Sequence, residues 1–236
     1  MQSFSDGTAR RIDSVIEDCS SADESPVAVF DADGTLWADD VGEDFFKHLL
    51  ERRLLNLEEG TDHWALYEAA CAVNKAEGYG SLGPIMKGLR EHDLIELAED
   101  FVDAHYASKI FPAQATLMAR LRDKGWSPWV VSASNRWIAA AGARLIGFPR
   151  DRVVGVDVKV LDGVLSGELI APVPCYEGKA LLVESKIGRK PRIAVGNAMT
   201  DLDMLECATD LVIVINPDER LTNEANARGW AIERWG

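Results

Sequence analysis

The sequence predicts an α/β fold in which a doubly wound parallel sheet carries an inserted all-helical segment. Short runs made only of apolar residues, such as Val27–Phe30, are typical of parallel strands buried on both faces. From residue 113 onward such runs alternate with helical patterns, which indicates parallel strands joined by right-handed crossovers. Between residues 40 and 111 the patterns are helix-like throughout. A Rossmann-like sheet with a helical insert accounts for all three observations.

The first part of the chain is expected to hold a helix, a strand and then the insert. An amphipathic helix at 8–19 is followed by the linker SSADESP and the strand Val27–Phe30. The insert contains the helical patterns EDFFKHLLERRLLNL and HDLIELAEDFVDAHYASKI. The stretch EGYGSLGP predicts a connection between helices, because its glycines and proline disfavour helix continuation. The expected domains are therefore a core of residues 1–39 and 113–236 and a helical cap of residues 40–112.

The second part of the chain is expected to complete the sheet. Its predicted elements are a helix at 113–125, a strand at 126–134, a helix at 136–147, a strand near 151–160, a turn within 161–169, a helix at 178–187, a strand at 192–197, a short helix at 201–208 and a strand at 210–217. In doubly wound sheets, ligands bind beyond the carboxyl ends of the strands. The residues that follow the predicted strands are thus the candidates for a functional site.

The composition excludes several classes of partner. The 236 residues include 25 basic and 39 acidic side chains, and this net charge of −14 repels nucleic acid and anionic lipid. No apolar run approaches the roughly 20 residues that a membrane span requires. The first residues lack the basic and apolar regions of a secretory signal, so the cytoplasm is the expected location. Nothing in the composition predicts the oligomeric state. An anionic substrate would need a site that is locally positive.

Polar side chains gather where the carboxyl ends of the predicted strands meet. The residues that end or follow three of these strands are Asp31, Asp33, Ser132, Asn197 and Asp201. Lys179 stands near the start of a predicted helix, where the positive end of the helix dipole also lies. Together they offer carboxylates for a hard cation, a hydroxyl donor and a fixed positive charge. This set of groups is suited to phosphate chemistry.

The order and the amino-acid sequences of these segments resemble the motifs of the haloacid dehalogenase superfamily of phosphohydrolases. The segments are DADGTL at 31–36, VVSAS at 130–134, Lys179 and GNAMTDLDML at 196–205. A single D-x-D pair is a weak signal, but four segments in the right order on an α/β pattern are specific. Within the superfamily the sequence is most similar to the phosphoserine phosphatase-like branch, which has a helical cap directly after its first motif. That branch also has a DG-x-L-(S/T)-G turn, which is DGVLSG here.

The resemblance implies that the first segment supplies a nucleophile and an acid/base. Asp31 would attack phosphorus and form an aspartyl-phosphate, which divides hydrolysis into two easier displacements. Asp33 would protonate the leaving oxygen and then deprotonate the attacking water, a task suited to a carboxyl group of raised pKa. Gly34 would allow the sharp turn that brings both groups and nearby backbone N–H donors to one phosphate.

The resemblance also implies how the phosphoryl group is held. Ser132 Oγ and the backbone N–H of Ala133 would bind its oxygens, and Lys179 would offset their charge.

Mg²⁺ is the implied cofactor. The Asp31 carboxylate, the Asp33 carbonyl and the last segment, with Asn197 and Asp201, would hold this ion, which keeps several of its waters. Asn197 departs from the family pattern, which usually has aspartate at this position. Three outcomes stay open: Asp201 coordinates the metal directly, metal affinity falls, or the site is impaired.

The implied substrate is a small phosphorylated molecule. Asp40 falls where phosphoserine phosphatases have an acidic residue that pairs with the substrate ammonium, which suits phosphoserine or another phosphoamine. Gly34 stands where those enzymes usually carry serine, however, and a clear counterpart of their cap arginine pattern is missing. Trp37, Trp64 and Tyr67 could form a cage for a quaternary ammonium, but aromatic residues at helical spacing are more typical of a core.

The predicted function is a magnesium-dependent phosphomonoesterase. Two alternatives on the same fold stay open: a phosphotransferase that uses the same intermediate, and a phosphate-binding or metabolite-binding protein that has lost turnover through Asn197. A dehalogenase is disfavoured, because displacing a halide requires no protonation of a leaving oxygen by a residue such as Asp33.

Overall fold

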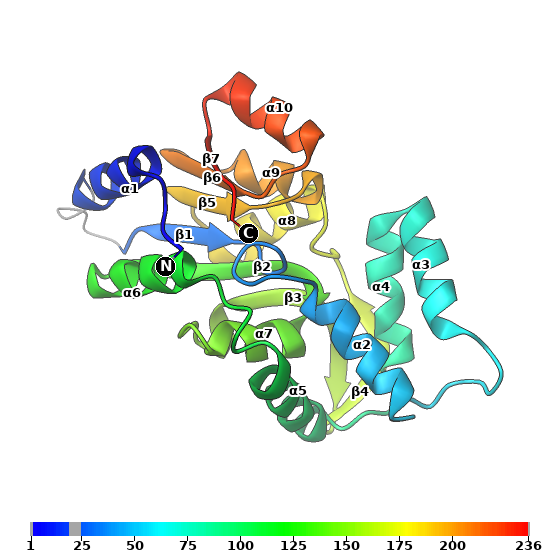
Figure 1. Cartoon of the computed structure of the whole chain (residues 1–236). Helices are drawn as coiled ribbons and strands as arrows, with labels where there is room; N and C mark the ends of the chain where they lie inside the picture. The colour runs from blue at the N-terminus through cyan, green and yellow to red at the C-terminus, as the bar shows by residue number, and fades with distance from the viewer. Residues whose placement is uncertain (1, 19–24, 236) are drawn as a thin grey trace.

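The computed structural model describes residues 2–18 and 25–235, and its centre is a seven-stranded sheet (Figure 1). The strands are β1 (Val27–Phe30), β2 (Ser127–Asn135), β3 (Val153–Leu161), β4 (Val164–Ile170), β5 (Ile193–Gly196), β6 (Leu211–Ile215) and β7 (Ala231–Glu233). Their order across the sheet is β4-β3-β2-β1-β5-β6-β7. All neighbouring pairs are parallel except β3 with β4. The predicted doubly wound α/β fold is confirmed, with the first strand at the middle of the sheet.

Helices cover both faces of this sheet. One face carries α1 (Asp6–Asp18), α6 (Pro112–Asp123) and α7 (Arg136–Arg144), and the other carries α8 (Glu177–Leu182), α9 (Leu202–Leu205) and α10 (Glu219–Arg228). The short turns are η1 (Arg150–Arg152), the π-helical η2 (Val183–Ile187) and η3 (Met199–Asp201). Within β1, Ala28 and Phe30 belong to the first apolar core, whereas Val27 and Val29 belong to the second. This alternation explains why the strand is apolar throughout.

Four helices lie between β1 and α6, where the sequence predicts the helical insert. They are α2 (Val41–Glu51), α3 (His63–Val73), α4 (Lys75–Ile85) and α5 (Glu91–His105). Helices α2 and α5 contact α7, whereas α3 pairs with α4, which contacts β3 and β4. In Figure 1, α3 and α4 stand together at one side of the molecule. One apolar core joins residues of α2 and α5 to the sheet, and the domain limits stay a prediction.

The structure corrects the prediction for EGYGSLGP, which is part of helix α4 and not a connection. Its glycines bring α4 close to the β3–β4 hairpin. A Cβ atom at Gly80 would lie 3.2 Å from Leu169, and one at Gly83 would lie 3.0 Å from Val158. Close packing against the hairpin therefore outweighs the low helix propensity of these residues.

Most other elements begin and end within a few residues of their predicted positions. The predicted end of the first helix at Cys19 lies outside the described residues. The predicted turn within 161–169 is the turn of a β-hairpin whose second strand is β4, while α10 and β7 are elements that the sequence patterns do not predict. Across residues 2–18 and 25–235, no helix is long and apolar enough to cross a membrane.

Candidate active site

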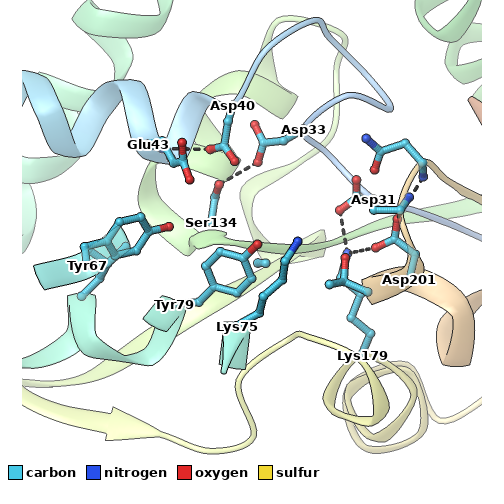
Figure 2. A pocket seen from close by; sticks show the side chains of 16 residues that line it. Asp31, Asp33, Asp40, Glu43, Tyr67, Lys75, Tyr79, Ser134, Lys179 and Asp201 are labelled. Atoms are coloured by element: carbon cyan, nitrogen blue, oxygen red, sulfur yellow. Dashed lines mark hydrogen bonds and ion pairs between the residues drawn. The ribbon is translucent and has the colours of Figure 1, made fainter. Parts of the chain in front are cut away.

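A cavity of about 200 Å³ lies between the carboxyl ends of the central strands and helices α2, α3 and α4 (Figure 2). The sheet side contributes Asp31, Asp33, Ala133, Ser134, Lys179, Asn197, Ala198, Thr200 and Asp201. The opposite wall contributes Asp40, Gly42, Glu43, Tyr67, Lys75, Tyr79 and Leu82. The cavity thus brings together most of the predicted site residues; the exceptions are Gly34 and Ser132.

Asp31 lies at the bottom of this cavity, directly after β1. Its backbone N–H donates to Val195 O of β5 at 2.8 Å, which continues the sheet pairing by one residue. Its Oδ1 lies 2.6 Å from Lys179 Nζ, and its Oδ2 accepts a hydrogen bond from Thr35 Oγ1 at 3.0 Å. Burial raises the pKa of Asp31 to about 7; repulsion by Asp201 adds to this, and Lys179 opposes it.

Lys179 is a buried cation shared by two carboxylates. It belongs to the first turn of α8, is 1% exposed, and places Nζ 2.7 Å from Asp201 Oδ1 as well as against Asp31. Burial alone would lower its pKa, but the two carboxylates outweigh burial and raise it. The ammonium group is therefore a fixed positive charge on the cavity floor, as the sequence predicts for the phosphate site.

Asp201 is held from both sides. Its Oδ2 accepts the backbone N–H groups of Asn197 at 2.9 Å and Ala198 at 3.0 Å, while its Oδ1 faces Lys179. Direct coordination of a metal by Asp201 would have to compete with these contacts. In this arrangement Asp201 orients Lys179 and the turn after β5, and its predicted role as a metal ligand stays a prediction.

Asp33 is held by three donors from different parts of the chain. Its Oδ1 accepts hydrogen bonds from Trp37 Nε1 at 2.9 Å and from the backbone N–H of Val41 at 2.7 Å. Its Oδ2 accepts one from Ser134 Oγ at 2.7 Å (Figure 2). Burial and the nearby Asp40 raise the pKa of Asp33 to about 7 against the effect of these bonds. This pKa suits a group that gives and takes a proton near neutral pH.

Gly34 makes the sharp turn expected of it. Its φ of +71° lies in the left-handed region that glycine adopts without strain. A Cβ atom at this position would collide with the side chain of Asn197, with 3.1 Å to Cγ. Asn197 therefore packs over Gly34, which links the last predicted segment to the first.

The structure places Ser134, not Ser132, at the cavity surface. Ser132 is fully buried, and its Oγ accepts the backbone N–H of Ser134 at 3.0 Å. Ala133 and Ser134 line the cavity instead. Ser132 thus orders the end of β2 by accepting this bond, and its hydroxyl keeps a proton to donate, so its predicted contact with phosphate stays a prediction.

The wall opposite the sheet is rich in carboxylates and phenols. Asp40 caps α2 by accepting the backbone N–H of Glu43 at 2.8 Å, and burial raises its pKa to about 6. Burial also raises the pKa values of Glu43, Tyr67 and Tyr79. Lys75, at the first position of α4, supplies a positive charge on this wall. The two acidic groups and the phenol oxygens can hold a cationic part of a ligand.

The residues missed by the sequence analysis are Thr35, Glu43, Lys75, Tyr79 and Ser134. Glu43 lies three residues after the helix cap Asp40, a spacing that places both on the same side of α2 and could have identified it. Of the possible aromatic cage, Trp37 is fully buried and Trp64 packs on Tyr67, with ring centroids 5.4 Å apart. The core interpretation holds for both tryptophans.

These features define a doubly wound α/β protein with an aspartate-based site at the end of its central strand and a cover of helices. The haloacid dehalogenase-like hydrolase family model matches residues 28–206, and the chain belongs to this family.

Relatives with assigned activities are distant. The phosphoserine phosphatase SerB1 of Mycobacterium tuberculosis is 28% identical over 152 residues, which cover 62% of this chain and 48% of the relative. The chain thus spans about half the length of the first curated relatives it matches. A histidinol-phosphatase of Neisseria meningitidis is 24% identical over 219 residues, which cover 87% of this chain and 97% of that protein.

Solved structures confirm the fold of the phosphoserine phosphatase-like branch. A substrate-bound phosphoserine phosphatase has a TM-score of 0.58 and 17% identity, with 90% of this chain and 94% of that chain covered. A protein of unknown function from Anaerococcus prevotii has a TM-score of 0.74 and 14% identity, with 100% and 93% covered.

Proposed function

We propose that the chain is a magnesium-dependent phosphomonoesterase that acts on a small phosphorylated metabolite through an aspartyl-phosphate. One observation carries this proposal. Asp31 and Asp33, two residues apart, both border one cavity. Lys179 Nζ donates a hydrogen bond to Asp31 at 2.6 Å, and the hydroxyl of Ser134 donates one to Asp33 at 2.7 Å. A nucleophile beside a fixed cation, and a separate carboxyl group of pKa about 7, are the groups that phosphoryl transfer requires.

Asp31 and Asp33 would divide the reaction between them. A carboxylate oxygen of Asp31 forms a bond to phosphorus as the bond to the leaving oxygen breaks, and Asp33 gives its proton to that oxygen. In the second half, Asp33 takes a proton from water, the water oxygen bonds to phosphorus, and the Asp31 carboxylate is released. A pKa of about 7 lets Asp33 serve in both directions.

Lys179 and the end of β2 would bind the phosphoryl group itself. The ammonium lies on the floor next to Asp31, and Ala133 borders the same cavity, so its backbone N–H is the candidate donor to a phosphoryl oxygen. These groups would place positive charge and a hydrogen-bond donor next to the phosphoryl group within a chain of net charge −14.

The residues present fit Mg²⁺. The described residues include no group of three or more His, Cys, Asp or Glu arranged to hold a metal, but Mg²⁺ is usually held by one or two carboxylates and keeps several waters. The Asp31 carboxylate, the Asp33 carbonyl and the Asn197 amide oxygen would hold it. The carboxylates at the cavity also outnumber its amino groups, an excess that a divalent ion offsets. When bound, the ion would polarise the phosphoryl oxygens and offset their charge.

The wall opposite the phosphate site supports a phosphorylated amine as substrate. Asp40 and Glu43 would face the leaving group from α2, and the phenols of Tyr67 and Tyr79 add oxygen acceptors. Phosphoserine and histidinol phosphate, which the named relatives act on, are both phosphate esters of alcohols that carry an amine. Lys75 on the same wall would additionally pair with a carboxylate, which phosphoserine has and histidinol phosphate lacks.

A phosphate-release screen tests this proposal. Phosphoserine, histidinol phosphate, phosphoethanolamine and 4-nitrophenyl phosphate would be compared, with and without Mg²⁺. We expect Mg²⁺-dependent release, its loss on Asp31→Asn, and a preference for the esters that carry an amine. Unchanged release by the Asp31→Asn variant would overturn the assignment.

Asn197 supports a second candidate, a binding protein without turnover. In that case phosphate esters bind but no phosphate is released even with excess Mg²⁺, and Asn197→Asp does not restore release. Transfer to added alcohols in place of water would identify a phosphotransferase.

A further inference from the structure

We propose that Ser134 and Trp37 are positioning residues for Asp33, and that they fix Oδ2 of Asp33 as the oxygen that carries the transferred proton. This inference rests on the proposed role of Asp33 as acid and base. It concerns two side chains that the resemblance does not assign, and it identifies which carboxyl oxygen acts.

The Oδ1 atom of Asp33 faces two groups that can only donate. The indole Nε1–H of Trp37 lies 2.9 Å from it, and the backbone N–H of Val41 lies 2.7 Å from it. Neither group can accept a hydrogen bond, so a proton on Oδ1 would point at two other protons. The two bonds therefore keep Oδ1 an acceptor in both protonation states of Asp33.

The Oδ2 atom faces a group that can change its role. Ser134 Oγ lies 2.7 Å from Oδ2, and a hydroxyl group can either donate or accept. When Asp33 is ionised, Ser134 donates to Oδ2; when Oδ2 carries a proton, Ser134 can turn its own proton elsewhere. Of the three partners, only this hydroxyl suits both states, which assigns the proton to Oδ2.

The packing around the two positioning residues holds them in place. Trp37 is fully buried, and Gly142 of α7 leaves room for its ring, since a Cβ there would lie 2.7 Å from Cη2. Gly42 of α2 does the same for Ser134, since a Cβ there would lie 2.9 Å from the serine Cβ. Two close approaches from different helices thus fix the two donors around one carboxyl group.

The chemical step follows from this arrangement. As the bond between phosphorus and the leaving oxygen breaks, the proton on Oδ2 moves to that oxygen, and Oδ2 becomes a carboxylate oxygen. Ser134 Oγ–H then donates to Oδ2, while Trp37 and Val41 continue to donate to Oδ1. No other reactant is required.

The test compares two aryl phosphates of similar size. Phenyl phosphate releases a basic phenolate that needs a proton donor, whereas 4-nitrophenyl phosphate releases a phenolate that is stable near neutral pH, so it depends less on the acid. We expect Ser134→Ala to lower kcat/KM, which reports only the steps up to the transfer of the phosphoryl group to Asp31, by about tenfold or more for phenyl phosphate and by much less for 4-nitrophenyl phosphate. Ser185→Ala, the same change at a serine whose Oγ bonds Leu181 O outside the cavity, should lower neither rate.

Asp33→Asn separates this inference from the proposed function. Its loss in kcat/KM should also be larger for phenyl phosphate; if the loss in kcat/KM is equal for both substrates, Asp33 is not the acid, and the proposed mechanism fails together with the inference. If Asp33→Asn shows the difference but Ser134→Ala lowers both rates equally, the inference alone is overturned. Trp37→Phe, which keeps a ring but removes the Nε1–H donor, provides the second variant should Ser134→Ala not fold by circular dichroism. It should show the same dependence on the leaving group, and an equal loss on both substrates would overturn the inference.

Discussion

Replacing Lys179 with methionine should destabilise the fold by about 3–5 kcal/mol, because it leaves two buried carboxylates without their shared cation. Lys179 Nζ lies 2.6 Å from Asp31 and 2.7 Å from Asp201, and the side chains of Lys179 and Asp201 are each 1% exposed. Methionine keeps a flexible apolar stem in the same space, so the change removes the charge more than the packing.

This loss should grow as the pH rises above neutral. The pKa of Asp31 is about 7 in the folded protein. The pKa of an aspartate is roughly 3.9 in an unfolded chain. Between about pH 4 and about pH 7 Asp31 is therefore ionised in the unfolded chain but still protonated in the folded protein, so the native protein loses stability as the pH rises through this range. Without Lys179, which lowers the pKa of Asp31, the folded pKa rises further. The variant then continues to lose about 1.4 kcal/mol per pH unit above pH 7, where the native protein no longer does.

Urea unfolding followed by circular dichroism, at about pH 6.5 and about pH 8.5, measures both effects. The Lys179→Met/Asp201→Asn double variant is the control, since it removes one of the two unpaired carboxylates and should recover part of the loss. A loss below about 1 kcal/mol, the range of an exposed ion pair, would refute the role of Lys179 as a buried counter-ion. An equal loss at both pH values would refute the linkage to Asp31.

Three further predictions follow from the site. The kcat/KM for phenyl phosphate should peak near neutral pH, since Asp31 must be ionised and Asp33 protonated and both pKa values are about 7; Asp33→Asn should remove the fall at high pH, and a flat profile for the native protein would contradict this. Asn197→Asp should lower the Mg²⁺ concentration for half-maximal rate by about tenfold, because it adds a negative oxygen ligand; an unchanged Mg²⁺ titration would exclude Asn197 from the metal site. Gly142→Ala should destabilise the fold by about 1–3 kcal/mol in urea unfolding, because its Cβ would lie 2.7 Å from the Trp37 ring, and an unshifted midpoint would show that the ring can move.

The sheet could be predicted from the sequence because its strands are short, apolar and end at polar residues. Val27–Phe30 is buried at every position, so hydrophobicity alone identifies it. Helix α4 could not be predicted in this way, because its glycines have a low helix propensity. They fit the structure because they allow close packing against a hairpin about 80 residues later in the chain, which local sequence does not reveal.

The candidate site was predictable where one segment supplies the residues, and less so where the fold assembles them. Asp31 and Asp33 follow one strand, and Lys179 and Asp201 belong to recognisable segments. Ser134 was missed because alternation along a strand does not reveal which of two serines faces a cavity when the strand end is irregular: the pairing of β2 with β3 shifts register between Val131 and Asn135.

Because β1 lies at the middle of the sheet, the residue proposed as nucleophile and the residues on the opposite wall of the cavity belong to different parts of the fold. Asp31 is attached to the strand flanked by β2 and β5, so its backbone amides should be among the slowest to exchange with solvent. Tyr67, Lys75 and Tyr79 come from the α3–α4 pair, which contacts the rest of the chain mainly through the sheet's antiparallel edge. New residues on that pair could therefore alter which molecules enter the cavity while the strand that carries Asp31 keeps its stability, a division that would let one catalytic scaffold diversify its choice of substrate.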